Sequence, residues 1–198
     1  MPDSQSPSRR VVIVGIPGVG KSTVVARVVE LLHARNLAVR IVNYGTVMME
    51  QASALYGIKS RDDMRKLSVD SQRKLQVYAA TEISRLQDQF VIVDTHLFIS
   101  TSEGFWPGMP MDVLNALKPT NLILVTARTE EIMSRRLRDT TRVRDAATKE
   151  SLEGELSVAH SLLYSSSLVC GCPALVVPNP EGPVDAAAEK IIKAIISA

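Results

Sequence analysis

The residues best suited to chemistry lie in one short segment near the N-terminus, residues 15–22, which reads GIPGVGKS. This segment matches the pattern G-x-x-x-x-G-K-[ST] in full and directly follows the apolar run at residues 11–14. Its glycines allow the backbone to curl with N–H groups directed at phosphate oxygens, and the helix expected after it would present its positive end to the same anion. A glycine-rich turn without a ligand is the alternative, but a strand before the segment and a helix after it favour a loop that binds a nucleoside triphosphate.

Two side chains of this loop and one carboxylate further along the chain could hold the phosphates and a metal. Lys21 can reach the β- and γ-phosphates, and the Ser22 hydroxyl suits Mg²⁺. Residues 90–94 read FVIVD, an apolar strand that ends in Asp94 at the carboxyl edge of the expected sheet. We predict that Asp94 approaches Mg²⁺ through water, because Mg²⁺ keeps much of its hydration shell; the alternative is that Asp94 only caps the segment that follows. His96 would face the same crevice, either hydrogen-bonded within its loop or in contact with substrate.

A second charged segment, residues 135–145, carries five arginines within eleven residues, although the whole chain has a net charge of only +2. Met133 and Leu137, four residues apart, would seat the preceding helix on the core, which leaves the arginines on its exposed flanks and in the loop beyond. Guanidinium groups on a closing flap can stabilise a transferred phosphoryl group and form paired hydrogen bonds to its oxygens. The pattern predicts a short flap that carries cations; the alternative is a solvated patch with local Arg–Asp pairs.

A further basic patch lies between the second and third expected strands. Thr46 follows a strand, and Arg65 lies in the segment RDDMRKL about one helix later. An insertion at about residues 44–88 could fold over the carboxyl edge of the sheet, opposite the flap, where Thr46 and Arg65 would hold a second phosphate-bearing molecule. Residues 104–110, GFWPGMP, predict a rigid apolar loop that either walls a base pocket or anchors itself to the core through Trp106.

Alternating strand and helix patterns would position these residues. Five short, nearly continuously apolar segments are typical of strands buried on both faces of a parallel sheet, at residues 11–15, 39–42, 90–94, 122–126 and 174–177. Apolar residues recur at helical spacing between them, and the last helix carries the stripe Val184, Ala188, Ile191, Ile192 and Ile195. Crossover helices between parallel strands predict an α/β fold, a three-layer α/β/α sandwich of the P-loop NTPase type with a five-stranded parallel sheet and a short arginine-bearing lid. We expect a single domain at residues 10–198 after a disordered tail at residues 1–9, with the lid at about residues 138–148.

Composition and charge narrow the class of protein. With 198 residues, 45% of them hydrophobic and 22% charged, the chain can bury a sizeable core, and its near-neutral charge gives no general attraction to nucleic acid. No apolar run approaches the roughly 20 residues of a membrane span, and the N-terminus lacks the apolar core of a signal peptide, so a cytoplasmic location is expected. Cys170 and Cys172 are too close for a metal knuckle or an easy disulfide, and we expect buried or half-buried thiols near a helix end.

The segments after two late strands argue against a GTP-dependent switch. Guanine selection in that class usually comes from an Asn-Lys-x-Asp segment. Residues 126–129 read TART and residues 177–180 read VPNP, so neither fits. A GTPase is therefore not favoured.

Taken together, four segments resemble the archaeal type of adenylate kinase. They are NYGTVM at residues 43–48, RDDMRKL at residues 61–67, VDTH at residues 93–96 and RRLRDTTRVRD at residues 135–145. Their order and spacing agree with that family from about residue 10 onward. The resemblance implies the reversible reaction ATP + AMP ⇌ 2 ADP with Mg²⁺, and it implies a compact homotrimer.

The resemblance also implies which residues bind the substrates. The phosphates of ATP and the metal would be held by Gly15, Gly18, Val19, Gly20, Lys21, Ser22 and Thr23. AMP would be bound by Thr46, Arg65 and His96. The metal ligands would be Ser22 and Asp94.

Four basic residues would be catalytic under the same resemblance: Lys21, Arg136, Arg142 and Arg144. The three arginines would clamp the phosphates during transfer. Arg138 departs from the family pattern, which has a small residue there, commonly glycine. The resemblance therefore does not define the local geometry of the flap. The chain also lacks the four-cysteine zinc flap of some bacterial relatives, so no structural zinc is expected.

The expected mechanism is direct in-line transfer. The phosphate of AMP is already ionised near neutral pH, so no general base is needed, and closure of the flap would exclude water as a competing acceptor. One alternative is another small-molecule kinase of the same architecture that accepts CMP, UMP or a hydroxyl group. The other is a nucleotide-dependent binding module that hydrolyses ATP slowly to change partners, which the second phosphate site disfavours.

Overall fold

The computed structural model describes residues 8–101, 103–138 and 148–196. Most of the expected tail at residues 1–9 and most of the expected lid at about residues 138–148 lie outside the described residues. Arg142 and Arg144 lie outside them as well.

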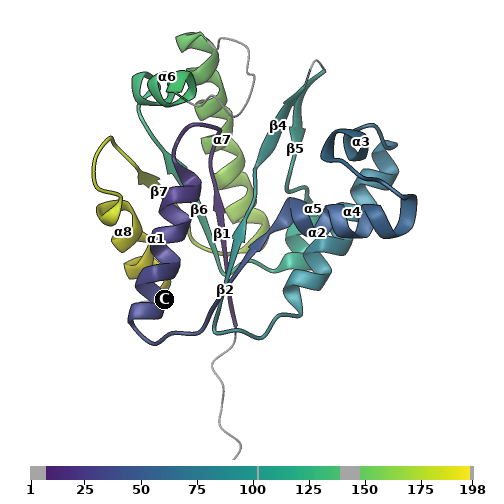
Figure 1. Ribbon diagram of the computed structural model, residues 1–198, viewed down its shortest axis with the longest axis horizontal. Helices are drawn as coiled ribbons and strands as arrows, with labels where there is room; N and C mark the ends of the chain where they lie inside the picture. The colour runs from purple at the N-terminus through teal and green to yellow at the C-terminus, as the bar shows by residue number, and fades with distance from the viewer. Residues whose placement is uncertain (1–7, 102, 139–147, 197–198) are drawn as a thin grey trace, which may run out of the picture.

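Five parallel strands form the central sheet in the order β2-β3-β1-β6-β7, and the sheet lies in the middle of the molecule in Figure 1. Their bounds are β1 Arg9–Val14, β2 Val39–Asn43, β3 Phe90–Asp94, β6 Asn121–Thr126 and β7 Ala174–Pro178. The predicted parallel sheet is confirmed, since all five apolar segments form strands in it. Asp94 at the end of β3 lies beside Ile13 of β1 and Asn43 of β2, so the carboxyl ends of three strands meet at one edge.

Helices cover both faces of the sheet, which gives the predicted three layers (Figure 1). One face is covered by α1 (Lys21–Ala34) and α8 (Asp185–Ile196), which pack against each other. The other face is covered by α2 (Tyr44–Tyr56), α4 (Val69–Ser84), α5 (Met111–Leu117) and α7 (Lys149–Cys170). The short helices α3 (Arg61–Arg65) and α6 (Thr129–Arg138) lie beyond the carboxyl edge of the sheet, towards the top of Figure 1.

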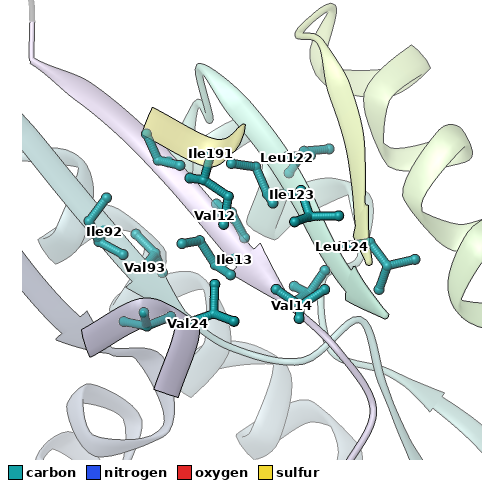
Figure 2. Close-up of a cluster of buried hydrophobic side chains, with 14 of the residues drawn as sticks. Val12, Ile13, Val14, Val24, Ile92, Val93, Leu122, Ile123, Leu124 and Ile191 are labelled. Atoms are coloured by element: carbon teal, nitrogen blue, oxygen red, sulfur yellow. The ribbon is translucent and has the colours of Figure 1, made fainter. Parts of the chain in front are cut away.

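The core lies between the sheet and its helices. Figure 2 shows Val12 and Ile13 of β1 beside Ile123 of β6, with Val24 of α1 and Ile191 of α8 next to them. These five side chains are at most 1% exposed. The apolar stripe predicted for the last helix is confirmed, because Ala188, Ile191, Ile192 and Ile195 of α8 are all buried. Burial on this scale is the main favourable term that fixes the sheet edge in place.

A hairpin at residues 98–107 was not expected from the sequence. Strand β4 (Phe98–Thr101) pairs antiparallel with β5 (Gly104–Pro107), so the first half of the rigid apolar loop predicted at residues 104–110 is a strand. The rings of Phe98 and Phe105 meet edge to face at 4.8 Å and stabilise the pair. Most residues of both strands are exposed, so the hairpin lacks the alternation of apolar and polar residues that reveals a half-buried strand.

Helix α6 is seated on the core by Ile132 and Met133, and not by the expected pair of Met133 and Leu137. Leu137 is 83% exposed, which contradicts its predicted contact with the core, whereas Ile132 is completely buried and Met133 is half-buried. Residues advance by about 100° along a helix, which places Leu137 about 140° from Ile132. Leu137 therefore lies on the outer face although its spacing from Met133 fits an apolar pair.

The two cysteines lie where the sequence predicted them. Cys170 is half-buried at the end of α7, Cys172 is buried two residues later, and both are free thiols. Burial raises the pKa of the Cys172 thiol to about 12, so it stays protonated at neutral pH. Among the described helices, none combines the length and the apolar character that crossing a bilayer requires.

Replacement of Ile132 and of Leu137 by alanine should have very different effects on stability. Ile132→Ala removes a fully buried side chain and should lower the free energy of unfolding by about 2–4 kcal/mol. Leu137→Ala removes an exposed side chain and should change it by less than about 0.5 kcal/mol. Urea unfolding followed by circular dichroism measures both free energies. Equal losses in the two variants would contradict the burial of Ile132 and the exposure of Leu137.

Candidate active site

The glycine-rich loop at residues 15–22 connects β1 to α1 at the carboxyl edge of the sheet. Gly18 and Gly20 have φ angles of 93° and 81°, in the left-handed region that favours glycine. Gly20 is also the N-cap of α1, so the loop leads directly into the positive end of that helix. The side chain of Val19 is completely buried, so a nucleotide can contact this residue only through its backbone.

Lys21 and Asp94 form an ion pair across this edge. Their side chains are only 11% and 17% exposed, and burial lowers the pKa of the Lys21 ammonium to about 8. The second carboxylate oxygen of Asp94 accepts a hydrogen bond of 3.1 Å from Nδ2 of Asn43. Ser22 and Thr23 lie exposed in the first turn of α1, where their hydroxyl groups are accessible.

Asn43 connects this ion pair to the start of α2. Its side-chain oxygen caps the helix by accepting from the backbone N–H of Thr46 at 3.1 Å, and it also accepts from the guanidinium of Arg61 at 3.1 Å. Nη2 of Arg61 lies 3.2 Å from the Thr46 hydroxyl. Arg61 and Asn43 were not singled out in the sequence, because only the folded chain brings α3 against the start of α2.

A cavity of about 680 Å³ joins the glycine-rich loop to the residues expected to bind the second substrate. Its lining includes Gly15 of the loop together with Arg65, His96 and Arg136. Residues 97–101, at the base and along the first strand of the hairpin, also line it, and Leu97, Phe98 and Ile99 supply its apolar part. Arg65 pairs with Asp62 of its own short helix at 3.0 Å, an exposed pair that costs little to break.

Thr46 lies apart from this cavity. It lines a second cavity of about 430 Å³ together with Lys59 and Arg61. The structure therefore brings Arg65 and His96 to the main cavity, whereas Thr46 is paired with Arg61.

Arg136 lies against the glycine-rich loop. Its Nε donates to the carbonyl oxygen of Pro17 at 2.9 Å, and its Nη2 pairs with Glu155 of α7 at 2.9 Å. Both side chains are largely buried, at 13% and 16% exposure. Glu155 could not be identified as a site residue from the sequence, because α6 and α7 come into contact only when the chain folds. Arg138 turns away from the loop and pairs with Glu181 at 2.8 Å.

Glu131 fixes the start of α6 to the loop after β7. Its carboxylate accepts from the guanidinium and the backbone N–H of Arg128, and from the backbone N–H of Glu181. These hydrogen bonds, the one from the Arg128 side chain foremost, lower the pKa of the Glu131 carboxyl to about 2. The helix that carries Arg136 is thereby held in a defined position.

A glycine-rich loop at a helix N-terminus, with a lysine–aspartate pair beside it and a cavity lined by further cations, defines the class of P-loop nucleotide-binding proteins. The family model described as an AAA domain matches residues 14–153. The adenylate kinase of Thermoplasma acidophilum is 41% identical over 94% of this chain and 98% of that protein. The adenylate kinase of Methanocaldococcus jannaschii is 35% identical over 93% and 97%. The chain belongs to the adenylate kinase family.

A solved structure shows the same fold in a more distant protein. Shikimate kinase from Acinetobacter baumannii superposes with a TM-score of 0.60 at 17% identity, over 96% of this chain and 94% of that one. At this identity the likeness shows the P-loop kinase fold alone.

Replacement of Glu131 by glutamine should reveal the role of its lowered pKa. The folded-state pKa is about 2 against 4.5 for the free side chain, so the ionised form stabilises the fold above pH 4.5 and this contribution is lost as the pH falls towards 2. We expect Glu131→Gln to lower the free energy of unfolding by about 1–2 kcal/mol at pH 7. Urea unfolding at pH 7, 5, 4 and 3 should show this difference shrinking below pH 4.5.

Glu130→Gln is the matched control. Glu130 is the neighbouring residue and forms an exposed ion pair with Lys149. It should have little effect at any pH. A difference between wild type and Glu131→Gln that stayed constant from pH 7 to pH 3 would contradict the assignment.

Proposed function

We propose that this protein is an ATP:AMP phosphotransferase that converts ATP and AMP reversibly into two molecules of ADP. The observation that carries the proposal is the single cavity in which the glycine-rich loop, Arg65 and Arg136 meet. Gly15, Ile16 and Pro17 of the loop line this cavity together with Arg65, so one phosphate group would bind at the loop and another beside Arg65. The adenylate kinases named above, similar over nearly their whole length, support the same reaction.

The donor nucleotide would bind at the glycine-rich loop. Backbone N–H groups of residues 18–22 and the ammonium of Lys21 would contact the phosphates of ATP. Mg²⁺ would arrive bound to ATP. The Ser22 hydroxyl and the Asp94 carboxylate would hold it, since both are oxygen donors of the kind that this ion prefers. When bound, the ion neutralises charge on the phosphates.

The acceptor would bind at the other end of the cavity. Arg65 and His96 line the cavity, and we propose that they contact AMP. Thr46 and Arg61 would act at the margin of this site, since they face the neighbouring cavity.

Transfer requires positioning and charge stabilisation more than acid–base chemistry. The acceptor oxygen of AMP is ionised near neutral pH, so the side chains need not remove a proton from it. Arg136, already beside the loop, would stabilise the transferred group together with Arg142 and Arg144 of the lid. A closed lid would exclude water, which otherwise competes as the acceptor.

Two finer expectations rest on the sequence, the first on its composition and the second on the family resemblance. They are a cytoplasmic location and assembly as a homotrimer. Size-exclusion chromatography with light scattering would give the mass of the assembly directly.

A coupled assay for ADP tests the proposed reaction. With ATP, Mg²⁺ and AMP, ADP should form with two molecules produced for each AMP consumed, and release of inorganic phosphate without an acceptor should be much slower. Lys21→Met should reduce the rate by a factor of about 10²–10³ while the protein stays folded, because a cation at the transferred group is lost.

CMP, UMP and a hydroxyl acceptor, assayed in parallel, separate this proposal from its alternatives. Faster transfer to CMP or UMP would indicate another nucleoside monophosphate kinase. Phosphate release that does not depend on any acceptor would indicate an ATP-hydrolysing binding module, and would refute the proposal.

Replacement of Arg65 tests the acceptor end of the cavity separately. Arg65→Met should raise the KM for AMP by about 10- to 100-fold, because a hydrogen bond to a charged group is worth about 1.5–3 kcal/mol, and should leave the KM for ATP unchanged. Arg73→Met, which removes an exposed arginine of α4 outside the cavity, is the matched control. An unchanged KM for AMP in Arg65→Met would show that AMP binds at a site that does not include Arg65.

A further inference from the structure

One carbonyl group of the glycine-rich loop is held by two side chains from distant parts of the chain. The carbonyl oxygen of Val19 accepts a hydrogen bond of 2.9 Å from Nδ2 of Asn179 and one of 3.0 Å from Nη1 of Arg135. Asn179 follows β7, and Arg135 lies in α6. A carbonyl oxygen has two lone pairs, so these two donors satisfy it completely.

The two donors are themselves fixed. Arg135 uses its second terminal nitrogen to donate to the carbonyl oxygen of Asn179 at 3.0 Å. The backbone N–H of Asn179 donates to the carbonyl oxygen of Thr126 at 2.7 Å, and Asn179 is only 6% exposed. The two side chains therefore form a rigid clamp between the ends of β6 and β7, helix α6 and the loop.

The planar peptide bond relates the fixed carbonyl group of Val19 to the N–H group of Gly20 at the phosphate site. A trans peptide is planar, and its C=O and N–H point in opposite directions. Fixing the Val19 carbonyl towards Asn179 and Arg135 therefore fixes the N–H of Gly20 in the opposite direction, away from both side chains. In a loop of this pattern that direction faces the bound phosphates. The fit is close, because a Cβ atom on Gly20 would lie 2.5 Å from Nδ2 of Asn179.

We propose that Asn179 and Arg135 are positioning residues that orient the Val19–Gly20 peptide for the triphosphate. They act through the loop and not by contact with the nucleotide. Arg135 is thereby distinguished from its neighbour Arg136, which lines the cavity. The proposal rests on the part of the proposed function that places ATP phosphates at the loop, and it is independent of the identity of the acceptor.

Titration calorimetry with two probes, MgATP and inorganic tripolyphosphate, tests this role without any acceptor. The variants are Asn179→Leu, which keeps the approximate size without the donor, and Arg135→Met. Each should weaken the binding of both probes by the same factor, about tenfold, which corresponds to about 1.4 kcal/mol. Arg135→Lys keeps the charge but cannot donate to both carbonyl groups, so an intermediate loss of about threefold is expected.

Two further measurements separate positioning from a purely structural role. The KM for AMP at saturating ATP should stay unchanged in all three variants, whereas the KM for ATP should rise. Arg35→Met, which removes an arginine paired with Glu189 at the far end of α1, is the control for the loss of a bridging arginine and should bind both probes normally. If Asn179→Leu does not fold, the two Arg135 variants still decide the question.

Unchanged binding of tripolyphosphate in the folded variants would overturn the proposal. Weaker binding of MgATP with normal binding of tripolyphosphate would mean that these residues contact the nucleoside, which also overturns it. So would a wild-type chain that bound neither probe. Failure of AMP as an acceptor would refute the proposed function but leave these titrations unaffected.

Discussion

The ion pair between Lys21 and Asp94 is the interaction on which the geometry of the site depends. It joins the loop after β1 to the end of the neighbouring strand β3, and Asn43 extends it to β2. Three segments far apart in the sequence thus meet within a few ångströms at one sheet edge. Burial of the Lys21 side chain lowers the pKa of its ammonium to about 8, because desolvation disfavours the charged form.

Helix α6 connects the donor site to the rest of the molecule. Arg135 and Arg136 each bond a carbonyl of the glycine-rich loop, Glu131 binds the loop after β7, and Ile132 packs into the core. The expected lid follows directly from the last residue of this helix. A shift of α6 would therefore be transmitted to the loop backbone, because Arg135 and Arg136 donate hydrogen bonds of 3.0 and 2.9 Å to its carbonyl groups.

Local signals made much of this structure predictable from the sequence. The glycine-rich loop and the five apolar strands were recognisable because their patterns depend on neighbouring residues, although only β1, β3 and β6 are largely buried and the edge strands β2 and β7 are not. Contacts between segments distant in sequence were not predictable. Asn179 and Arg61 carry no local signature, the hairpin at residues 98–107 lacks apolar alternation, and the outward turn of Leu137 depends on how α6 docks. The roles of Arg142 and Arg144 stay predictions.

The central claim is that two phosphate sites face each other across one cavity. A crystal structure with a bisubstrate analogue, two adenosines joined by five phosphates, tests it most directly. The account predicts one molecule of the analogue per chain, with one end of the polyphosphate at the loop of residues 15–22 and the other within hydrogen-bonding distance of Arg65. An analogue bound only at the loop, with its second adenosine in solvent and Arg65 still paired with Asp62, would contradict it.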